Sequence, residues 1–413
     1  MPLAGSMGMT KLTDQSSLAS RPEREFVLAC ARTRLDPSHR NRLRDLLVGP
    51  LNWELVTSLA TQHYLTPLLH HHLSGQLSPA VPYEVRASLE EIAQLAARWN
   101  LFLSARMVTL LQAFKDSAVP AVPFKGPALA SLAYGNVALR PSVDLDFILP
   151  QQHLPRAYDV LISAGFRPSL DPASLRDAAY LASGRAGQHS FFSEENLLVE
   201  LHTEKSLRYL PAPLNWEELR ARLTPVWVAG HEVRTFSTED NLVLLSVHGA
   251  KHLWERLIWV CDLAELFQAS PDIDWDTSER AAARLQCRRM WFLGLSLAHD
   301  LLDAPLPASV LASIRKDAVV TRLARQVQAK LFAGEPDSPG APARFLFRLR
   351  SYDNLADGFR QCWRVATQPT EDDWRAFPLP PWAAPLHAAL RPLGLVKRHR
   401  LGLRWRIMRA NRG

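Results

Sequence analysis

Residues 119–236 constrain the fold most, because their pattern differs from that of the chain on either side. Short apolar runs are separated there by glycine and proline, as in AVPFKG, LDFILP, LLVEL, VWVAG and HEVRTF, which predicts strands. Apolar stretches with helical character, PALASLAY and LPRAYDVLISAG, lie between some of these runs. Strands that alternate with helices predict a mixed α/β sheet. The pair VWVAG and HEVRTF predicts a closing hairpin that turns at Gly230.

Helical periodicity flanks this α/β segment. Apolar residues recur at intervals of three and four over about 22–118 and again from about 238 to 333. Ser237 and Asp240 predict a capping box at the start of the second helical stretch. The expected organisation is a disordered tail (1–20), an N-terminal helical segment (21–112), an α/β core (113–236), a helical domain (237–333), a linker (334–345) and a C-terminal helical segment with a basic tail (346–413).

The composition predicts a soluble, cytoplasmic chain. Hydrophobic residues make up 47% of the 413 residues, which is enough to bury substantial cores. The N-terminus lacks the pattern of a signal peptide, and no apolar run approaches the ~20 residues that span a bilayer. The four cysteines are far apart and form no CxxC pair, which favours a reducing compartment over a disulfide framework or a zinc site: Cys30, Cys261, Cys287 and Cys362.

The formal charge of +7 is concentrated at the C-terminus. Residues 391–413 hold eight of the 48 Lys and Arg residues and no acidic residue, so 40 basic residues remain against 41 acidic ones. No basic stripe extends into the body, and a nucleic-acid partner is therefore not expected. The tail itself has three interpretations: a solvated end, a helix that makes weak contact with a membrane surface, or, least favoured, a nucleic-acid contact.

The segment RPSVDLDFILP, residues 140–150, carries the strongest chemical feature. Asp144 and Asp146 are two residues apart in an apolar strand, so their side chains point to the same face about 7 Å apart. Two ionised carboxylates without a partner would be costly there, because like charges repel and burial disfavours both. A divalent cation removes this cost. Mg²⁺ (or Mn²⁺) prefers carboxylates together with substrate phosphates, and two such ions can clamp a phosphoryl displacement.

Two further features strengthen this interpretation, since a DxD pair alone is more often an exposed strand end with two solvated carboxylates. Lys125 and Gly126 form a turn between an apolar strand and a helix, where a glycine lets the backbone approach phosphate closely. Glu200 lies on the later apolar run LLVELHTE. Glu200 taken alone would more often be a surface carboxylate.

This order of elements resembles the polymerase-β nucleotidyltransferase superfamily. The chain is still more similar to an uncharacterised bacterial branch of it, the nucleotidyltransferase family 5 group, in KGPALASLAYG, in RPSVDLDFIL and in the acid-x-His of ELH. The similarity continues in NWELVTSLATQHYLTPLL and in HGAKHLWERLIWVCDLAEL, and so covers most of residues 50–270. The resemblance identifies 113–236 as the nucleotidyltransferase core.

The resemblance implies a metal-dependent enzyme that moves a nucleoside monophosphate from an NTP to a hydroxyl of a small molecule or protein. It assigns catalysis and metal binding to Asp144, Asp146 and Glu200, and the β- and γ-phosphates to Lys125 and Gly126. Well-studied superfamily members have Gly-Ser at this turn, where this chain has Lys-Gly-Pro. Either Lys125 replaces the serine contact or the triphosphate is held differently.

Other polar residues near the motif have two interpretations each. Arg140 either neutralises phosphate charge or forms a structural salt bridge. His248 and His252 have a spacing that can bind zinc, but the HExxH glutamate is missing, and a packed or substrate-facing pair is favoured. Together with His202 and Lys251 they are candidate substrate contacts. Two rival functions remain open: a catalytically silent binding module on the same fold, and a phosphotransferase on the same scaffold.

Overall fold

The computed structural model describes residues 22–75, 77–170, 174, 188–204, 207, 209–333, 340–368, 374, 386 and 391. The predicted tail at 1–20, residues 334–339 of the predicted linker and residues 392–413 of the basic tail lie outside the described residues.

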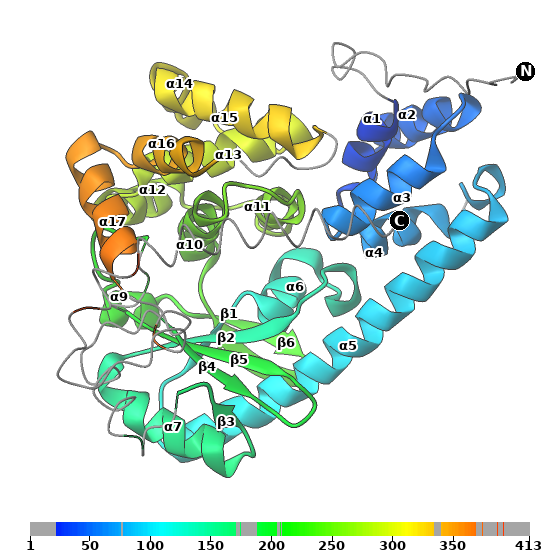
Figure 1. The fold of residues 1–413 in the computed structure, drawn as a ribbon. Coiled ribbons are helices and arrows are strands. Elements are labelled where there is room, and N and C mark those ends of the chain that lie inside the picture. Colours follow the sequence, from blue (N-terminus) through cyan, green and yellow to red (C-terminus); the bar gives the residue numbers. More distant parts are fainter. Residues whose placement is uncertain are drawn as a thin grey trace, which may run out of the picture.

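A five-stranded mixed sheet forms the centre of the fold (Figure 1), which confirms the predicted α/β class. The order is β1-β2-β5-β4-β3, with β2 and β5 parallel and the other neighbours antiparallel. The strands are β1 (Val122–Phe124), β2 (Asp144–Leu149), β3 (Arg167–Pro168), β4 (His189–Phe192) and β5 (Leu198–Thr203). Parallel pairing of β2 with β5 requires a long connection, and α7 (Leu154–Ser163) lies within it.

The two faces of β2 have different surroundings. Leu145, Phe147 and Leu149 are fully buried in a hydrophobic cluster with residues of α5 (Tyr83–Asp116) and α7. Ile148, on the opposite face, joins a larger cluster formed mainly by the helices. Because side chains alternate along a strand, Asp144 and Asp146 share the face of Ile148. The carboxylates are thus directed towards the helical part of the molecule.

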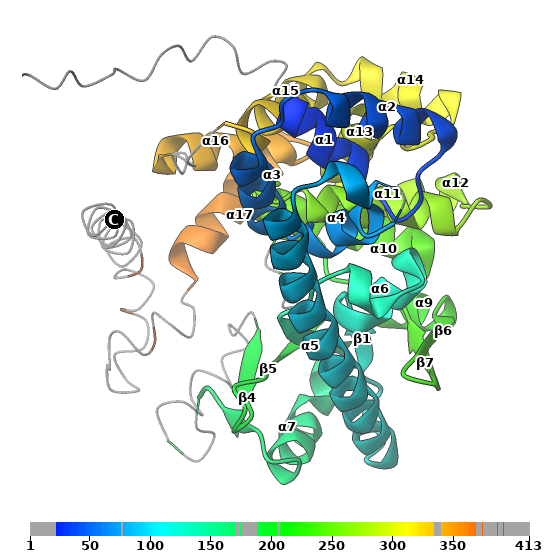
Figure 2. The same cartoon turned by 90° about the vertical axis from the view of Figure 1, so that its right-hand side faces the viewer.

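Helices that are far apart in the sequence share this larger cluster. Figures 1 and 2 show the N-terminal helices beside the C-terminal ones. The His63 side chain contacts the carbonyl oxygen of Leu331 at 2.9 Å, and the Thr33 hydroxyl donates to Glu265 at 2.6 Å. The N-terminal helices that precede α5 are α1 (Pro22–Cys30), α2 (Pro37–Val48), α3 (Trp53–Gln62), α4 (Thr66–Leu73) and the 3-10 turn η2 (Ser78–Ala80).

The remaining short elements lie around the sheet. They are α6 (Gly126–Tyr134), the 3-10 turns η3 (Val137–Leu139) and η4 (Gln151–His153), α9 (Trp216–Ala221) and the hairpin of β6 (Thr224–Val228) and β7 (His231–Thr235). Gly230 has φ of +79° in the hairpin turn, as predicted, because glycine tolerates this conformation. β7 is tied to β1 by a hydrogen bond from the Thr235 hydroxyl to the Pro123 carbonyl oxygen, 2.9 Å long.

The C-terminal helices follow the hairpin. The Ser237 hydroxyl accepts from the backbone N–H of Asp240 at 3.2 Å, which confirms Ser237 as the cap, whereas the Asp240 carboxylate accepts from Arg222. These helices are α10 (Thr238–Lys251), α11 (Ile258–Ala269), α12 (Trp275–Arg284), α13 (Arg288–Leu302), α14 (Ala308–Lys316), α15 (Ala318–Leu331), α16 (Ala341–Ser351) and α17 (Leu355–Thr367). Among the helices that the structure describes, none combines the length and apolar character needed to cross a bilayer.

Candidate active site

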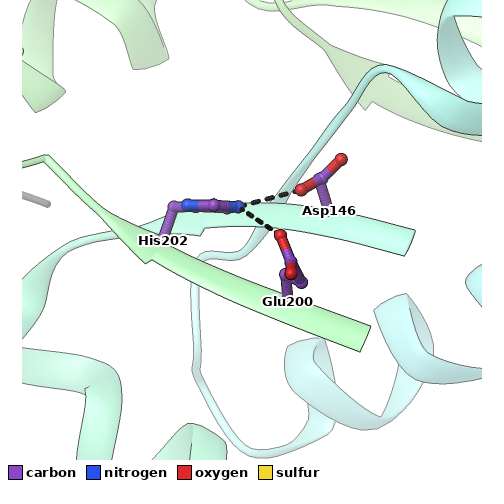
Figure 3. A group of neighbouring side chains, drawn as sticks. All are labelled: Asp146, Glu200 and His202. Atoms are coloured by element: carbon purple, nitrogen blue, oxygen red, sulfur yellow. Dashed lines mark hydrogen bonds and ion pairs between the residues drawn. The ribbon is translucent and has the colours of Figure 1, made fainter. Parts of the chain in front are cut away.

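Strand register brings the predicted carboxylates together. Asp146 of β2 is directly opposite Glu200 of β5, and His202 follows two residues later on the same face. Figure 3 shows these three side chains converging from the two strands. Lys125 directly follows β1, whose Phe124 is paired with Asp146. Three chain segments that are distant in sequence therefore contribute to this site.

Asp146 is the centre of the polar network. Its Oδ2 lies 2.9 Å from the Lys125 Nζ, and its Oδ1 lies 2.8 Å from the His202 Nε2. The same His202 nitrogen is 3.6 Å from the Glu200 Oε2. The Gln188 amide donates to the other Glu200 oxygen at 2.8 Å. Both carboxylates are thereby held in one orientation by Lys125, His202 and Gln188.

The network separates the two aspartates electrostatically. Burial, together with the Asp146 charge, raises the pKa of Asp144 to about 6. Burial opposes ionisation of Asp146 as well, but the charge of Lys125 and the hydrogen bond from His202 hold its pKa well below the ordinary value. Burial opposes the charge on His202, yet its hydrogen bonds to Asp146 and Glu200 raise its pKa. Lys125 thus supplies positive charge to these carboxylates, and His202 contacts both of them.

The Lys-Gly turn has an unusual backbone. Lys125 has φ of +62° and ψ of −144°, a region that costs a side-chain-bearing residue about 1–3 kcal/mol. Gly126 follows with φ of +52° and begins α6. This conformation carries the chain from β1 into the first turn of α6 and leaves the Lys125 ammonium on Asp146. Strain of this kind is concentrated at functional sites.

Three of these side chains form a group that suits a metal ion. Asp146, Glu200 and His202 each offer one ligand atom, and these atoms lie within 4.8 Å of one another. Two carboxylate oxygens and an imidazole nitrogen are ligands that divalent cations accept in proteins. The predicted set differed, since it had Asp144 in place of His202. Asp144 is not a member of the compact group among the described residues.

Arg140 is engaged in a structural ion pair. Its Nε and Nη2 donate to the two carboxylate oxygens of Asp262 at 2.6 and 2.9 Å, and both side chains are buried. The Tyr134 hydroxyl donates to the same carboxylate at 2.8 Å. Arg140 was expected either to neutralise phosphate charge or to form a structural salt bridge, and the structure shows the salt bridge. It joins the segment that precedes β2 to α11 in the helical part.

The two predicted histidines pack together at the end of α10. The ring centroids of His248 and His252 are 4.7 Å apart, and both rings contact Trp259. Burial, together with the charges of Lys125 and His252, holds the pKa of His248 well below its ordinary value. His248 also experiences the charge of Asp146, so the end of α10 borders the carboxylates. Lys251, in the last turn of α10, lies with its ammonium 5.6 Å from the Tyr209 ring.

Three participants were not assigned these roles from sequence. His202 was expected only as a substrate contact, although its position two residues after Glu200 already placed it on the same strand face. Gln188 and Asp262 were not singled out, because neither stands in a pattern that distinguishes it from an ordinary polar residue.

A mixed sheet that presents aligned carboxylates beside a turn at a helix N-terminus is consistent with a nucleotidyltransferase fold. A family model described as uncharacterised nucleotidyltransferase matches residues 49–303, which is more than half of the chain, and the chain belongs to this family. The resemblance seen in the sequence is therefore confirmed. No curated protein and no solved structure matches the chain.

Proposed function

We propose that the chain transfers a nucleoside monophosphate from an NTP to a hydroxyl of a small molecule or protein, with Mg²⁺ or Mn²⁺ as cofactor. The observation that carries this proposal is the alignment of Asp146 with Glu200 on parallel strands, beside the Lys125 ammonium. The match to the nucleotidyltransferase family supports it.

The position of each residue suggests its role in the proposed reaction. Asp146, Glu200 and His202 would hold the cation, with Asp144 beside them as a further carboxylate. The bound cation would neutralise charge that develops on the α-phosphate. Lys125 and the Gly126 turn lie where they can contact the phosphates that leave.

In the proposed step the acceptor oxygen forms a bond to the α-phosphorus, and the bond from that phosphorus to the pyrophosphate oxygen breaks. The proton of the acceptor hydroxyl passes to Glu200, whose Oε1 is held by Gln188. Pyrophosphate leaves with the electron pair of the broken bond. Donors that are already oriented reduce the reorganisation needed as charge develops.

Labelled nucleotides test this proposal directly. The purified chain is incubated with Mg²⁺, a cell extract and NTPs labelled at either the α- or the γ-phosphate. Nucleotidyl transfer places only the α-label on an acceptor, whereas phosphoryl transfer places the γ-label there. Asp159→Asn changes an exposed carboxylate on α7 and serves as the matched control. Labelling that survives Asp144→Ala combined with Asp146→Ala would show that the assignment is wrong.

Calorimetry separates the enzyme from a silent binding module. ATP, CTP, GTP and UTP are titrated in turn into the chain with Mg²⁺ and with EDTA. The proposed activity requires metal-dependent binding of at least one nucleotide. Absence of any such binding favours the silent module.

A further inference from the structure

Cationic side chains gather on the side of the candidate active site formed by the helices. Arg348 of α16 and Lys251 of α10 both lie 5.6 Å from the Tyr209 ring, and Arg348 also donates to the Lys251 carbonyl oxygen. Arg256 lies 4.2 Å from the Tyr64 ring and 5.8 Å from the Trp259 ring. α16 packs against α10, and Figure 1 shows α10 on one side of the sheet and α7 on the other.

His252 lies at the centre of this group. Burial and the charges of Lys251, Lys125, Arg348 and Arg256 lower its pKa to about 3. The His252 ring lies 5.2 Å from the Trp259 ring, which Arg256 also contacts, and His252 directly follows Lys251, whose carbonyl oxygen accepts from Arg348. Lys125, whose charge also acts on His252, contacts Asp146 and so connects this group with the carboxylates.

The two arginines of this group lack carboxylate partners among the described residues. Arg348 makes one hydrogen bond, to a backbone carbonyl, and its Nε is buried without an acceptor. Arg256 makes only its contacts with the two aromatic rings. The carboxylate of Glu255, the residue next to Arg256, forms an ion pair with Arg344, with Oε1 and Nη2 3.7 Å apart. Both arginine side chains are half-buried, so water solvates their charge only in part. Neither has a carboxylate among the described residues to balance that charge.

Like charges that are gathered and half-buried favour an anion that bridges them. Guanidinium groups match the oxygens of phosphate and bind them in pairs. The turn at Lys125 provides one cation without the serine expected at that position, so a phosphate chain there needs further positive groups.

We propose that Arg348, Lys251 and Arg256 form a phosphate-binding subsite on the helical side of the candidate active site. The subsite takes either the terminal phosphates of the nucleotide or a phosphate on the second substrate. The proposal rests on the proposed function for its place in the reaction, but the anion site itself is independent of catalysis.

Calorimetry of the full chain with inorganic tripolyphosphate, in EDTA and at physiological salt, tests the subsite. We expect binding that weakens about tenfold or more in Arg348→Gln and in Arg256→Gln. Arg348→Lys keeps the charge and recovers part of the affinity. Arg315→Gln removes an equal charge from an exposed position on α14 and leaves the affinity unchanged. Thermal melting of each variant checks that the fold is retained.

Competition identifies the source of the phosphate. If an NTP with Mg²⁺ displaces tripolyphosphate, the subsite holds the nucleotide; if both bind at once, it holds a phosphate of the second substrate. We expect Asp144→Asn combined with Asp146→Asn to abolish transfer but to keep tripolyphosphate binding. Loss of the proposed function can therefore be distinguished from loss of the anion site. Tripolyphosphate that does not bind, or that binds Arg348→Gln and Arg256→Gln as tightly as the wild type, overturns the subsite.

Discussion

The Lys125 ammonium lies 2.9 Å from the Asp146 carboxylate, across the first two strands of the sheet. The lysine therefore contacts a carboxylate that a divalent cation would also use. Its backbone is strained at φ of +62°, and the strain is maintained by β1 on one side and α6 on the other. One residue thus links the turn expected to hold phosphate to the residues expected to hold metal.

Replacement of Lys125 by methionine separates these two functions. Lys125→Met removes a cation that competes for Asp146, so we expect Mn²⁺ to bind about tenfold more tightly in the absence of nucleotide. Nucleotide binding should weaken, because the phosphates lose a positive partner. Electron paramagnetic resonance measures free Mn²⁺, and calorimetry measures the nucleotide. Lys330→Met on α15 is the control, and weaker Mn²⁺ binding in Lys125→Met would contradict the competition.

His202 provides the nitrogen of the proposed metal group. We expect His202→Gln to weaken Mn²⁺ binding by about tenfold, because one of three ligands is lost. Pulsed electron paramagnetic resonance of the wild-type complex should show coupling to a histidine nitrogen that the variant lacks. His231→Gln, an exposed histidine on β7, should keep that coupling. A wild-type spectrum without it would leave His202 only as a donor to Asp146.

The Arg140–Asp262 ion pair is buried on both sides, which makes it sensitive to the loss of one partner. Asp262→Asn leaves a buried guanidinium without its counter-charge, and we expect a loss of about 3–5 kcal/mol in the free energy of unfolding. Arg140→Met combined with Asp262→Leu should recover much of this loss. Urea denaturation measures both. As a control, Glu217→Gln breaks an exposed pair with Arg220 and should change the free energy of unfolding little. If Asp262→Asn changes it as little as Glu217→Gln does, the buried pair does not stabilise the fold as expected.

His63 makes stability dependent on pH. Its ring Nε2 contacts the Leu331 carbonyl oxygen, and its Nδ1 accepts from the Leu257 N–H, so the neutral form satisfies both partners. Burial lowers its pKa to about 4, below its ordinary value of 6.5. The unfolded chain therefore takes up the proton first as the pH falls.

The resulting stability is fully present above pH 6.5 and is lost as the pH falls from there towards 4, by up to about 3 kcal/mol. Urea denaturation across this range measures the loss, which in His63→Gln should be smaller by the contribution of His63, whereas the buried His248 and His252, whose pKa values are also lowered, keep theirs. His231→Gln should follow the wild type. A parallel pH dependence in His63→Gln would show that other groups are responsible.

Features set by neighbouring residues could be predicted from the sequence. Alternation along a strand placed Asp144 and Asp146 on one face, and the tolerance of glycine for positive φ located the hairpin at Gly230. The cap at Ser237 followed from the same kind of local rule. These interactions extend over a few residues and depend on backbone sterics and local hydrogen bonds. The identities of neighbouring residues are therefore enough to predict them.

The partners of those residues were decided by the tertiary structure. Asp146 meets Glu200 because β2 and β5 pair in parallel at one register, and Arg140 meets Asp262 because α11 packs against α6 beside the segment that precedes β2. The sequence determined that two carboxylates share a strand face; the tertiary structure decided that Lys125 and His202 contact one of them. The physical reason is that both faces of the sheet must be buried at once, and only the packing of distant helices selects the register that does so.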